Sequence, residues 1–184
     1  MKKIILFVVV LGLAGAGFFY WWNNQADVRE LNKTLPEGVK VVKSLFGEEY
    51  KIVNKIDGYE FKIPPEWEGI KKIEYFPRET EQGYIVSSIG LEGKEGVGRV
   101  VDIAQFQIED SNINLEFWVK AYFEKSGLIN EFEKEMVGNF EVVKTREFIM
   151  PIGYVYFLKN DFAIYSIVCG SENSVRYIIT HGRW

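Results

Sequence analysis

The sequence has 184 residues, a formal net charge of −4 at pH 7 and a pI near 5.3. This length accommodates one compact domain with an appended segment. Because basic residues are not in excess, nucleic acid is not expected as a partner. The single cysteine, Cys169, excludes an intramolecular disulfide and a multi-cysteine zinc site.

An apolar segment opens the chain. Lys2 and Lys3 precede residues 4–22, which carry no charged side chain. A helix of about 20 apolar residues crosses the hydrocarbon core of a bilayer, and lysines favour its cytoplasmic side. We therefore expect residues 1–22 to be a signal-anchor that holds the protein in the cell membrane through residues 4–22. This single-pass topology places the domain on the extracytoplasmic side.

A cleaved signal peptide is the alternative for the same segment. Residues 14–16 (Ala-Gly-Ala) have the small-x-small form of a cleavage site, and cleavage near Ala16 would give a secreted protein. Cleavage there would leave the aromatic run 18–22 close to a new N-terminus in water. The same run suits the lipid–water interface of an uncleaved anchor, which favours the anchor.

Residues 23–45 are polar and mixed, with Pro36 and Gly38. This composition predicts a linker or a short juxtamembrane helix. Asn32-Lys33-Thr34 matches the N-glycosylation pattern, a short motif that also occurs by chance.

The domain that we assign to residues 46–184 is organised around residues 58–67, Gly-Tyr-Glu-Phe-Lys-Ile-Pro-Pro-Glu-Trp. Apolar side chains alternate there with Glu60 and Lys62, which predicts a strand with one face on a core. The double proline ends the strand, and Trp67 follows as a large core anchor. Residues 50–56 predict the preceding strand, joined through a type I′ turn at Asp57-Gly58.

Further strands are expected along the rest of the chain, at residues 70–76, 84–91, 98–108, 140–144, 153–159 and 162–170. Residues 92–97 read as a hairpin loop, because no phosphate-binding glycine motif is present. Residues 128–137 are compatible with a helical turn or an acidic loop. Both faces of 162–170 are apolar, so we expect both faces to be covered. Asn160-Asp161 predicts a hairpin before this strand.

Two helices are expected in the domain. The first, residues 114–126, has one apolar stripe, with Asn112 or Asn114 as its N-cap and Gly127 as its stop. The stripe consists of Leu115, Trp118, Val119, Tyr122 and Phe123. The second is a short closing helix over 172–179, with Val175, Ile178 and Ile179 directed inward.

The stretch 59–67, with its aromatic-x-Phe-x-x-Pro-x-x-Trp form, and the order of elements resemble the PsbP-like family over about residues 45–184. This resemblance implies an α+β fold, an antiparallel β-sheet flanked by helices in an α/β/α sandwich. Plant members are non-enzymatic extrinsic subunits of photosystem II that help retain calcium and chloride. The export segment resembles a bacterial one, so a photosystem role does not carry over, and no ion-binding residue of the family maps onto this sequence.

The residues of this sequence give little support for a catalytic site. A Cys169–His181 dyad is conceivable, but Cys169 lies in an apolar strand, which favours a buried, inert thiol. Asp110, Asn112 and Asn114 match the first ligands of a calcium loop, but Leu115 stands where that loop requires Gly and Ala121 where it requires Glu. Helix capping is the better interpretation of these three residues.

Two larger sets have both a functional and a structural interpretation. The carboxylates could form catalytic pairs but are usually solvated; they are Asp102, Glu109, Glu131, Glu133 and Glu135. The aromatic side chains could line a pocket or a binding face, or simply fill a core; they are Tyr75, Phe76, Tyr84, Trp118, Tyr154, Tyr156, Phe157 and Tyr165.

We therefore predict an α+β domain with an antiparallel sheet, preceded by one N-terminal transmembrane helix. The expected function is a membrane-tethered, extracytoplasmic, non-catalytic binding or assembly module with an unidentified protein partner. The alternative is a receptor for a small or hydrophobic ligand in a pocket between helix and sheet; an enzyme is less favoured. No catalytic, cofactor-binding or metal-binding residue is predicted, and no cofactor.

Overall fold

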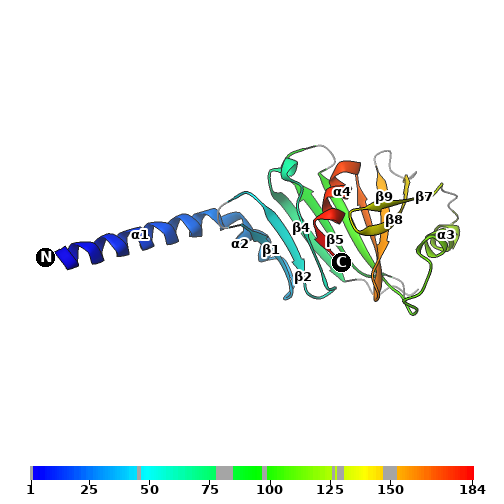
Figure 1. Ribbon diagram of the computed structural model, residues 1–184, viewed down its shortest axis with the longest axis horizontal. Coiled ribbons are helices and arrows are strands. Elements are labelled where there is room, and N and C mark those ends of the chain that lie inside the picture. Colours follow the sequence, from blue (N-terminus) through cyan, green and yellow to red (C-terminus); the bar gives the residue numbers. More distant parts are fainter. Residues whose placement is uncertain are drawn as a thin grey trace.

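The computed structural model describes residues 2–44, 47–77, 85–96, 99–125, 127, 131–146 and 153–184, with backbone alone for residues 2–9, 85, 86 and 146. It is an α+β structure with antiparallel strands, as the sequence predicts, but the strands form two sheets instead of the single sheet expected (Figure 1). The smaller sheet has the order β1-β2-β3-β11, with strands Val39–Lys43, Tyr50–Asn54, Tyr59–Lys62 and Gly182–Arg183. The larger sheet has the order β4-β5-β6-β10-β9-β8-β7. Its strands in chain order are Ile70–Pro77, Ile85–Gly93, Val100–Gln107, Glu133–Val137, Phe140–Arg146, Tyr154–Lys159 and Ala163–Cys169.

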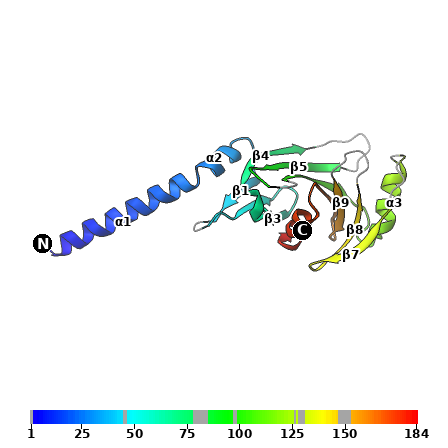
Figure 2. The ribbon, with the colours of Figure 1, turned by 90° about the horizontal axis from the view of Figure 1, so that it is seen from above.

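Helices lie on both sides of the larger sheet. The described helices are α1 (Lys2–Asn24), α2 (Ala26–Asn32), α3 (Leu115–Lys125) and α4 (Glu172–Thr180), with a 3-10 turn at Pro65–Trp67. Figure 2 shows α4 within the curve of the larger sheet, beside the smaller sheet, and α3 on the outer side. The smaller sheet and α2 lie at the end of the domain from which α1 projects, and α3 lies at the opposite end.

Strand β10 confirms the expectation of a strand covered on both faces. Tyr165, Ile167 and Cys169 belong to the core shared with the smaller sheet and α4. Ile164 and Val168 face the second core, beneath α3. Phe162, expected at the start of this strand, instead lies in the β9–β10 connection with 80% of its side chain exposed.

The stretch around 58–67 packs as its pattern predicts. Tyr59, Phe61 and Ile63 are buried, and Trp67 is fully buried after the double proline. The Trp67 indole nitrogen donates to Ser174 Oγ on α4 at 3.3 Å, which connects the opening stretch to the last helix. This contact also explains why a large aromatic side chain that carries a polar N–H is accommodated inside the core.

The turn between β2 and β3 differs from the predicted type I′ turn. Asn54 pairs with Tyr59, so four residues, 55–58, form the connection. Asn54 Oδ1 accepts from the backbone N–H groups of Ile56 and Asp57, and Gly58 N donates to Asn54 O. Of these residues only Gly58 has a positive φ, so the two positive φ values of a type I′ turn are not met. The asparagine side chain supplies an Asx-type turn instead.

Residues 133–137 form the edge strand β7, rather than the helical turn or acidic loop that the sequence suggested. The strand pairs with β8 from Glu133↔Lys144 to Val137↔Phe140. The strand lacks the alternation of apolar and polar residues that identifies a strand in the sequence, because most of its side chains are charged and only Val137 is buried. A charged edge strand of this kind resists pairing with other chains.

Helices α3 and α4 confirm the expected helical segments. Leu115, Val119 and Phe123 are buried, and Asn114 Oδ1 accepts from Phe117 N as the predicted cap. Gly127 has a φ of 70°, as a helix-terminating glycine does. On α4, the three side chains expected to point inward are fully buried: Val175, Ile178 and Ile179.

Helix α1 extends away from the domain (Figure 1). Its described apolar side chains are exposed, including Leu13 at 69%, Phe19 at 66% and Tyr20 at 66%. Among the residues that the structure describes, no helix is long and apolar enough to cross a membrane.

The stretch expected to be a linker or juxtamembrane helix contains both α2 and β1. Helix α2 follows α1 with only Gln25 between them. Strand β1 joins the smaller sheet, with Val39 and Val41 in the core. The packed sheet therefore begins earlier in the chain than residue 46.

Candidate binding surface

Helix α2 covers the edge of the smaller sheet that is formed by β1. Asn32 Nδ2 donates to Val41 O at 2.9 Å, and Val41 N donates to Asn32 Oδ1 at 2.7 Å. The side-chain amide thus takes the place of a neighbouring strand at Val41, and Val28 packs into the core beside it. The nitrogen that N-glycosylation would modify is occupied by this contact.

Asp27 forms the ionic contacts at the junction between α2 and the smaller sheet. Its carboxylate accepts from Tyr50 OH, and lies 3.6 Å from Lys43 Nζ and 3.7 Å from Lys94 Nζ. Burial acts to raise the pKa of Asp27, but the hydrogen bonds from Tyr50 and Val28 N and the two lysines outweigh it. The pKa therefore lies below its ordinary value, and the carboxylate is charged at neutral pH.

Arg29 connects α2 to α1. Its Nη1 donates to Trp22 O at 2.6 Å, and its guanidinium lies 3.9 Å from the centre of a Trp22 ring. Backbone bonds also continue across Gln25, from Gln25 N to Trp21 O and from Arg29 N to Gln25 O. The end of α1 is therefore held to α2, and α2 is held to the sheet.

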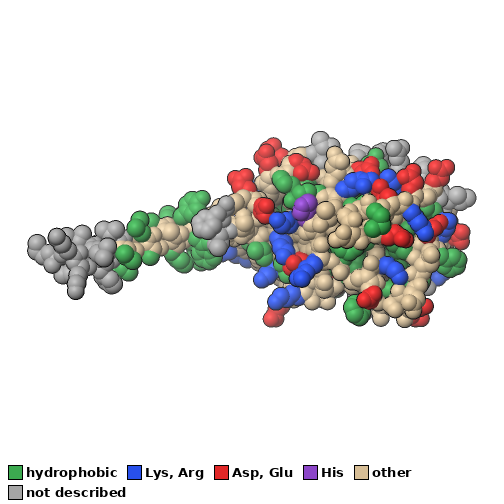
Figure 3. Space-filling model, viewed as in Figure 1, with side chains coloured by type: hydrophobic (Ala, Val, Ile, Leu, Met, Phe, Trp, Pro, Cys, Tyr) green, Lys and Arg blue, Asp and Glu red, His purple; other side chains and the backbone are tan. Residues whose placement is uncertain are grey.

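The outer face of the smaller sheet is basic. Each strand contributes one outward cation: Lys40 from β1, Lys51 from β2, Lys62 from β3 and Arg183 from β11. Glu60 is the single carboxylate that the strands add to this face, and it lies 2.6 Å from Lys51 Nζ. Lys62 pairs with Glu49, which precedes β2, at 3.0 Å. Figure 3 shows Lys and Arg side chains gathered at the end of the domain nearest α1. We call this surface the basic face.

A shallow hollow of about 480 Å³ adjoins the basic face near the β2–β3 turn. Its lining includes Lys55, Glu60, Arg183 and Trp184. It is open and carries both charges, so it differs from the enclosed apolar pocket of a typical small-molecule site. Aromatic side chains fill the space between α3 and the larger sheet: Phe106 contacts Trp118 of the helix, and Phe157 contacts Phe123 of the helix.

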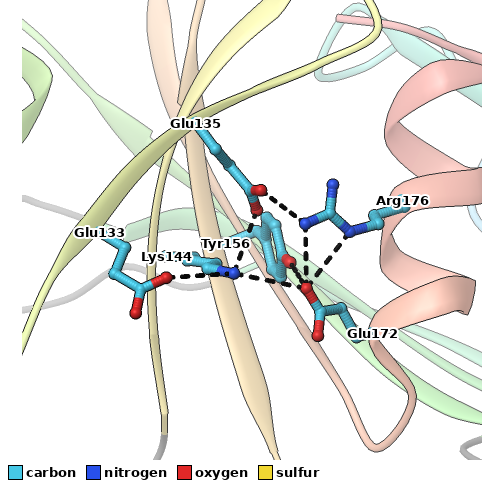
Figure 4. A network of polar contacts seen from close by, with 6 residues as sticks. All are labelled: Glu133, Glu135, Lys144, Tyr156, Glu172 and Arg176. Atoms are coloured by element: carbon cyan, nitrogen blue, oxygen red, sulfur yellow. Dashed lines mark hydrogen bonds and ion pairs between the residues drawn. The ribbon is translucent and has the colours of Figure 1, made fainter.

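A polar cluster joins α4 to strands β7–β9 (Figure 4). Arg176 Nη2 lies 2.5 Å from Glu135 Oε2 and 3.0 Å from Glu172 Oε1. Lys144 Nζ lies 3.2–3.6 Å from Glu133, Glu135 and Glu172. Tyr156 OH donates to Glu172 Oε1 at 2.8 Å. The residues of this α4 cluster are Glu133, Glu135, Lys144, Tyr156, Glu172 and Arg176.

The pKa shifts in the α4 cluster follow from mutual pairing. The hydrogen bond from Tyr156, then those from Arg176, hold the pKa of Glu172 below its ordinary value. Burial and the hydrogen bond to Glu172 raise the pKa of Tyr156, so the phenol stays protonated. The hydrogen bond to Glu135 raises the pKa of Arg176. These groups stabilise one another's charges, which is the chemistry of a structural clamp rather than of a general base.

The structure does not bring the candidate dyad together. Cys169 is buried on β10, and burial raises the pKa of its thiol to about 11. His181 is exposed at the end of α4, where Nδ1 lies 2.9 Å from Tyr177 O and the ring stacks on Tyr177. The burial of Cys169 that the sequence favoured is confirmed, and a buried thiol with a raised pKa is expected to be unreactive.

The three residues that match a calcium loop have structural roles. Asp110 Oδ1 accepts from Asn112 N, and Asn114 caps α3, as the capping interpretation required. Within the described part of the chain, no group of three or more His, Cys, Asp or Glu residues is arranged to hold a metal ion. Tyr156, Phe157 and Tyr165 are core residues, Phe76 is exposed, and Tyr84 lies outside the described residues.

Two large aromatic side chains are exposed on the side of the domain away from α1. Phe117 on α3 is 71% exposed, and Phe162 on the β9–β10 connection is 80% exposed. Lys159 links the two regions, since its Nζ donates to Ser111 O at 2.8 Å and to Ile113 O at 2.9 Å. The sequence did not single out these phenylalanines, although Phe117 lies outside the apolar stripe of its helix.

The basic face was also missed from the sequence. The polar residues that alternate with buried ones in β1, β2 and β3 are the signal for this face. Lys40, Lys51 and Lys62 lie on three consecutive strands, whereas Arg183 joins their face only because β11 pairs with β3. No family model, curated protein or solved structure matches the chain.

Proposed function

We propose that this chain is a non-catalytic binding or assembly module, tethered outside the cell membrane by α1. The tether rests on the sequence, in which residues 4–22 carry no charge and follow two lysines. We extend the proposal to a single-pass, uncleaved anchor, with cleavage near Ala16 and secretion as the alternative. The resemblance to the PsbP-like family supports an extrinsic binding role.

The observation that carries this proposal is the junction between α1 and the domain. Asn32 and Asp27 attach α2 to the smaller sheet, and Arg29 attaches α2 to the end of α1. These contacts all lie after Ala16 and would survive cleavage there; in an uncleaved chain they fix the orientation of the domain relative to its anchor. Cleavage near Ala16 would also leave the exposed rings of Phe18 and Phe19 in water.

The partner-binding residues that we propose are Phe117 and Phe162. Large aromatic side chains dominate the energetics of protein interfaces, and these two are exposed around the loop that Lys159 holds. They lie on the side of the domain away from α1, where a protein partner reaches them without meeting the bilayer.

A receptor for a small or hydrophobic ligand is the second candidate. It is less favoured because aromatic side chains fill the space between α3 and the sheet. An enzyme is less favoured still, because Cys169 and His181 are not placed together and the α4 cluster is paired within itself.

Photo-crosslinking in native membranes tests the proposal. A photoreactive residue at position 162 of the full chain should give a defined protein adduct, and the same residue at Val100, which is 52% exposed on β6, should not. Purification in mild detergent should recover the same partner, and Phe117→Ser with Phe162→Ser should reduce its yield. Equal adducts at positions 162 and 100, or none at 162, would refute the partner-binding role.

A further inference from the structure

We propose that the basic face binds the anionic headgroups of the bilayer that holds α1, so that the domain rests against the membrane. This inference depends on the tether of the proposed function and adds a second membrane contact. It assigns a lipid-binding role to Lys40, Lys51, Lys62 and Arg183.

The first argument is charge. The chain carries a net charge of −4, yet the strands of the smaller sheet place four cations and one carboxylate on the outer face. Lys51 stands directly opposite Lys62, and Glu60 directly opposite Arg183. Glu60 pairs with Lys51 and lies 4.0 Å from Arg183, and Glu49 pairs with Lys62, so four cations face two carboxylates and positive charge remains in excess. An anionic surface would attract this excess positive charge.

The second argument is position. The basic face lies at the end of the domain from which α1 projects (Figures 1 and 3). The contacts of Asp27 and Asn32 prevent α2 from swinging away from the sheet. If α1 is in a bilayer, this face is therefore held close to the headgroups.

The third argument is the kind of side chain. Besides its charges, the face shows only Val42 and Val53 among its outward strand residues, and no aromatic side chain. Protein interfaces rely on aromatic anchors, whereas lysines on flexible stems suit a fluid anionic surface. Each cation near such a surface increases the docked population about fivefold. This composition favours lipid over an acidic protein.

The test uses the full chain in nanodiscs of neutral phosphatidylcholine, with or without about one third of anionic phosphatidylglycerol. Co-elution of the chain with both kinds of disc checks the tether separately. A water-soluble acetylating reagent is applied briefly, and the rate at each lysine is read by mass spectrometry. Lys120, on α3 at the opposite end, is the internal control, with its side chain 49% exposed.

We expect acetylation of Lys40 and Lys62 to slow by on the order of fivefold in anionic discs, with Lys120 unchanged. High salt should remove the protection, because exposed charges are screened. The double variant Lys40→Glu, Lys62→Glu should lose the protection that remains at Lys51, while Lys120→Glu should keep it.

Equal rates in both kinds of disc would overturn the proposal while leaving the tether intact. Protection in native membranes but not in anionic discs would overturn it in favour of an acidic protein. A chain that fails to co-elute with either disc would remove the tether, and the lipid-binding proposal with it.

Discussion

Asn32 and Val41 form a reciprocal pair, in which the side-chain amide of Asn32 both donates to and accepts from the backbone of Val41, at 2.9 and 2.7 Å. This pair closes the edge of the smaller sheet and attaches the helix that follows α1. Replacing Asn32 with Ala leaves the N–H and C=O of Val41 without these partners. Each lost hydrogen bond of this kind costs about 1 kcal/mol.

We expect Asn32→Ala to lower the free energy of unfolding by about 1–3 kcal/mol and to speed hydrogen exchange at the Val41 amide. Thr34→Ala is the matched control, because it also removes the glycosylation pattern but loses only an exposed bond to Leu31 O. Denaturant unfolding of the full chain in detergent measures both variants. Equal effects of the two substitutions would contradict the role of the amide.

Asp27 predicts a pH dependence of the junction. Its pKa in the folded protein is below the ordinary value. A carboxylate with a lowered pKa stabilises the folded protein at pH values above its pKa in the unfolded chain, which is about 3.9. This stabilisation is lost as the pH falls through the pKa of the folded protein. Asp27→Asn should therefore destabilise the protein at pH 7, and this difference should shrink below about pH 4. Melting temperatures of both forms across this range provide the measurement, and a constant difference would argue against the ionic junction.

The stability of the α4 cluster should depend on the planar guanidinium group of Arg176. Arg176→Lys keeps the charge but cannot bond Glu135 and Glu172 with the same geometry. We expect a loss of about 1–2 kcal/mol, seen as weaker exchange protection in α4. Lys120→Ala, which removes an exposed pair with Glu116, should cost much less, because exposed ion pairs contribute little to stability. If the two losses were similar, the cluster would be a solvated ion pair rather than a clamp.

Cys169 should be unreactive in the folded protein. Burial raises the pKa of its thiol to about 11, so the thiolate is scarce at pH 8. A thiol reagent such as Ellman's should react at pH 8 only after denaturant is added. Rapid reaction of the native chain would revive the idea of a cysteine nucleophile.

The buried side of this fold was largely predictable from the sequence. Alternation at 59–63 and the stripe on α3 report burial directly, because strand and helix periods decide which side chains face a core. Strand β7 was missed because an edge strand with charged side chains lacks that alternation. The β2–β3 turn was predicted incorrectly because the Asn54 side chain, rather than the Asp57-Gly58 pair, determines its geometry.

The candidate surface was less accessible to sequence reasoning. Asn32 was noticed only as part of a glycosylation pattern, and its contact with Val41 requires the position of α2 against the sheet. Lys40, Lys51 and Lys62 share a face through the register of β1, β2 and β3. Arg183 joins them because β11 returns from the end of the described chain to pair with β3. Such long-range placements follow from the packing of the whole domain and not from any local pattern.

The most direct test of the account is the side and permanence of the membrane attachment. Asp161→Cys places a thiol in the exposed β9–β10 connection of the full chain, while Cys169 stays buried. We predict that a membrane-impermeant maleimide labels position 161 in intact cells and that the labelled, uncleaved chain stays in the membrane after alkaline extraction. Labelling only after lysis, or recovery of a shortened soluble chain, would contradict the account.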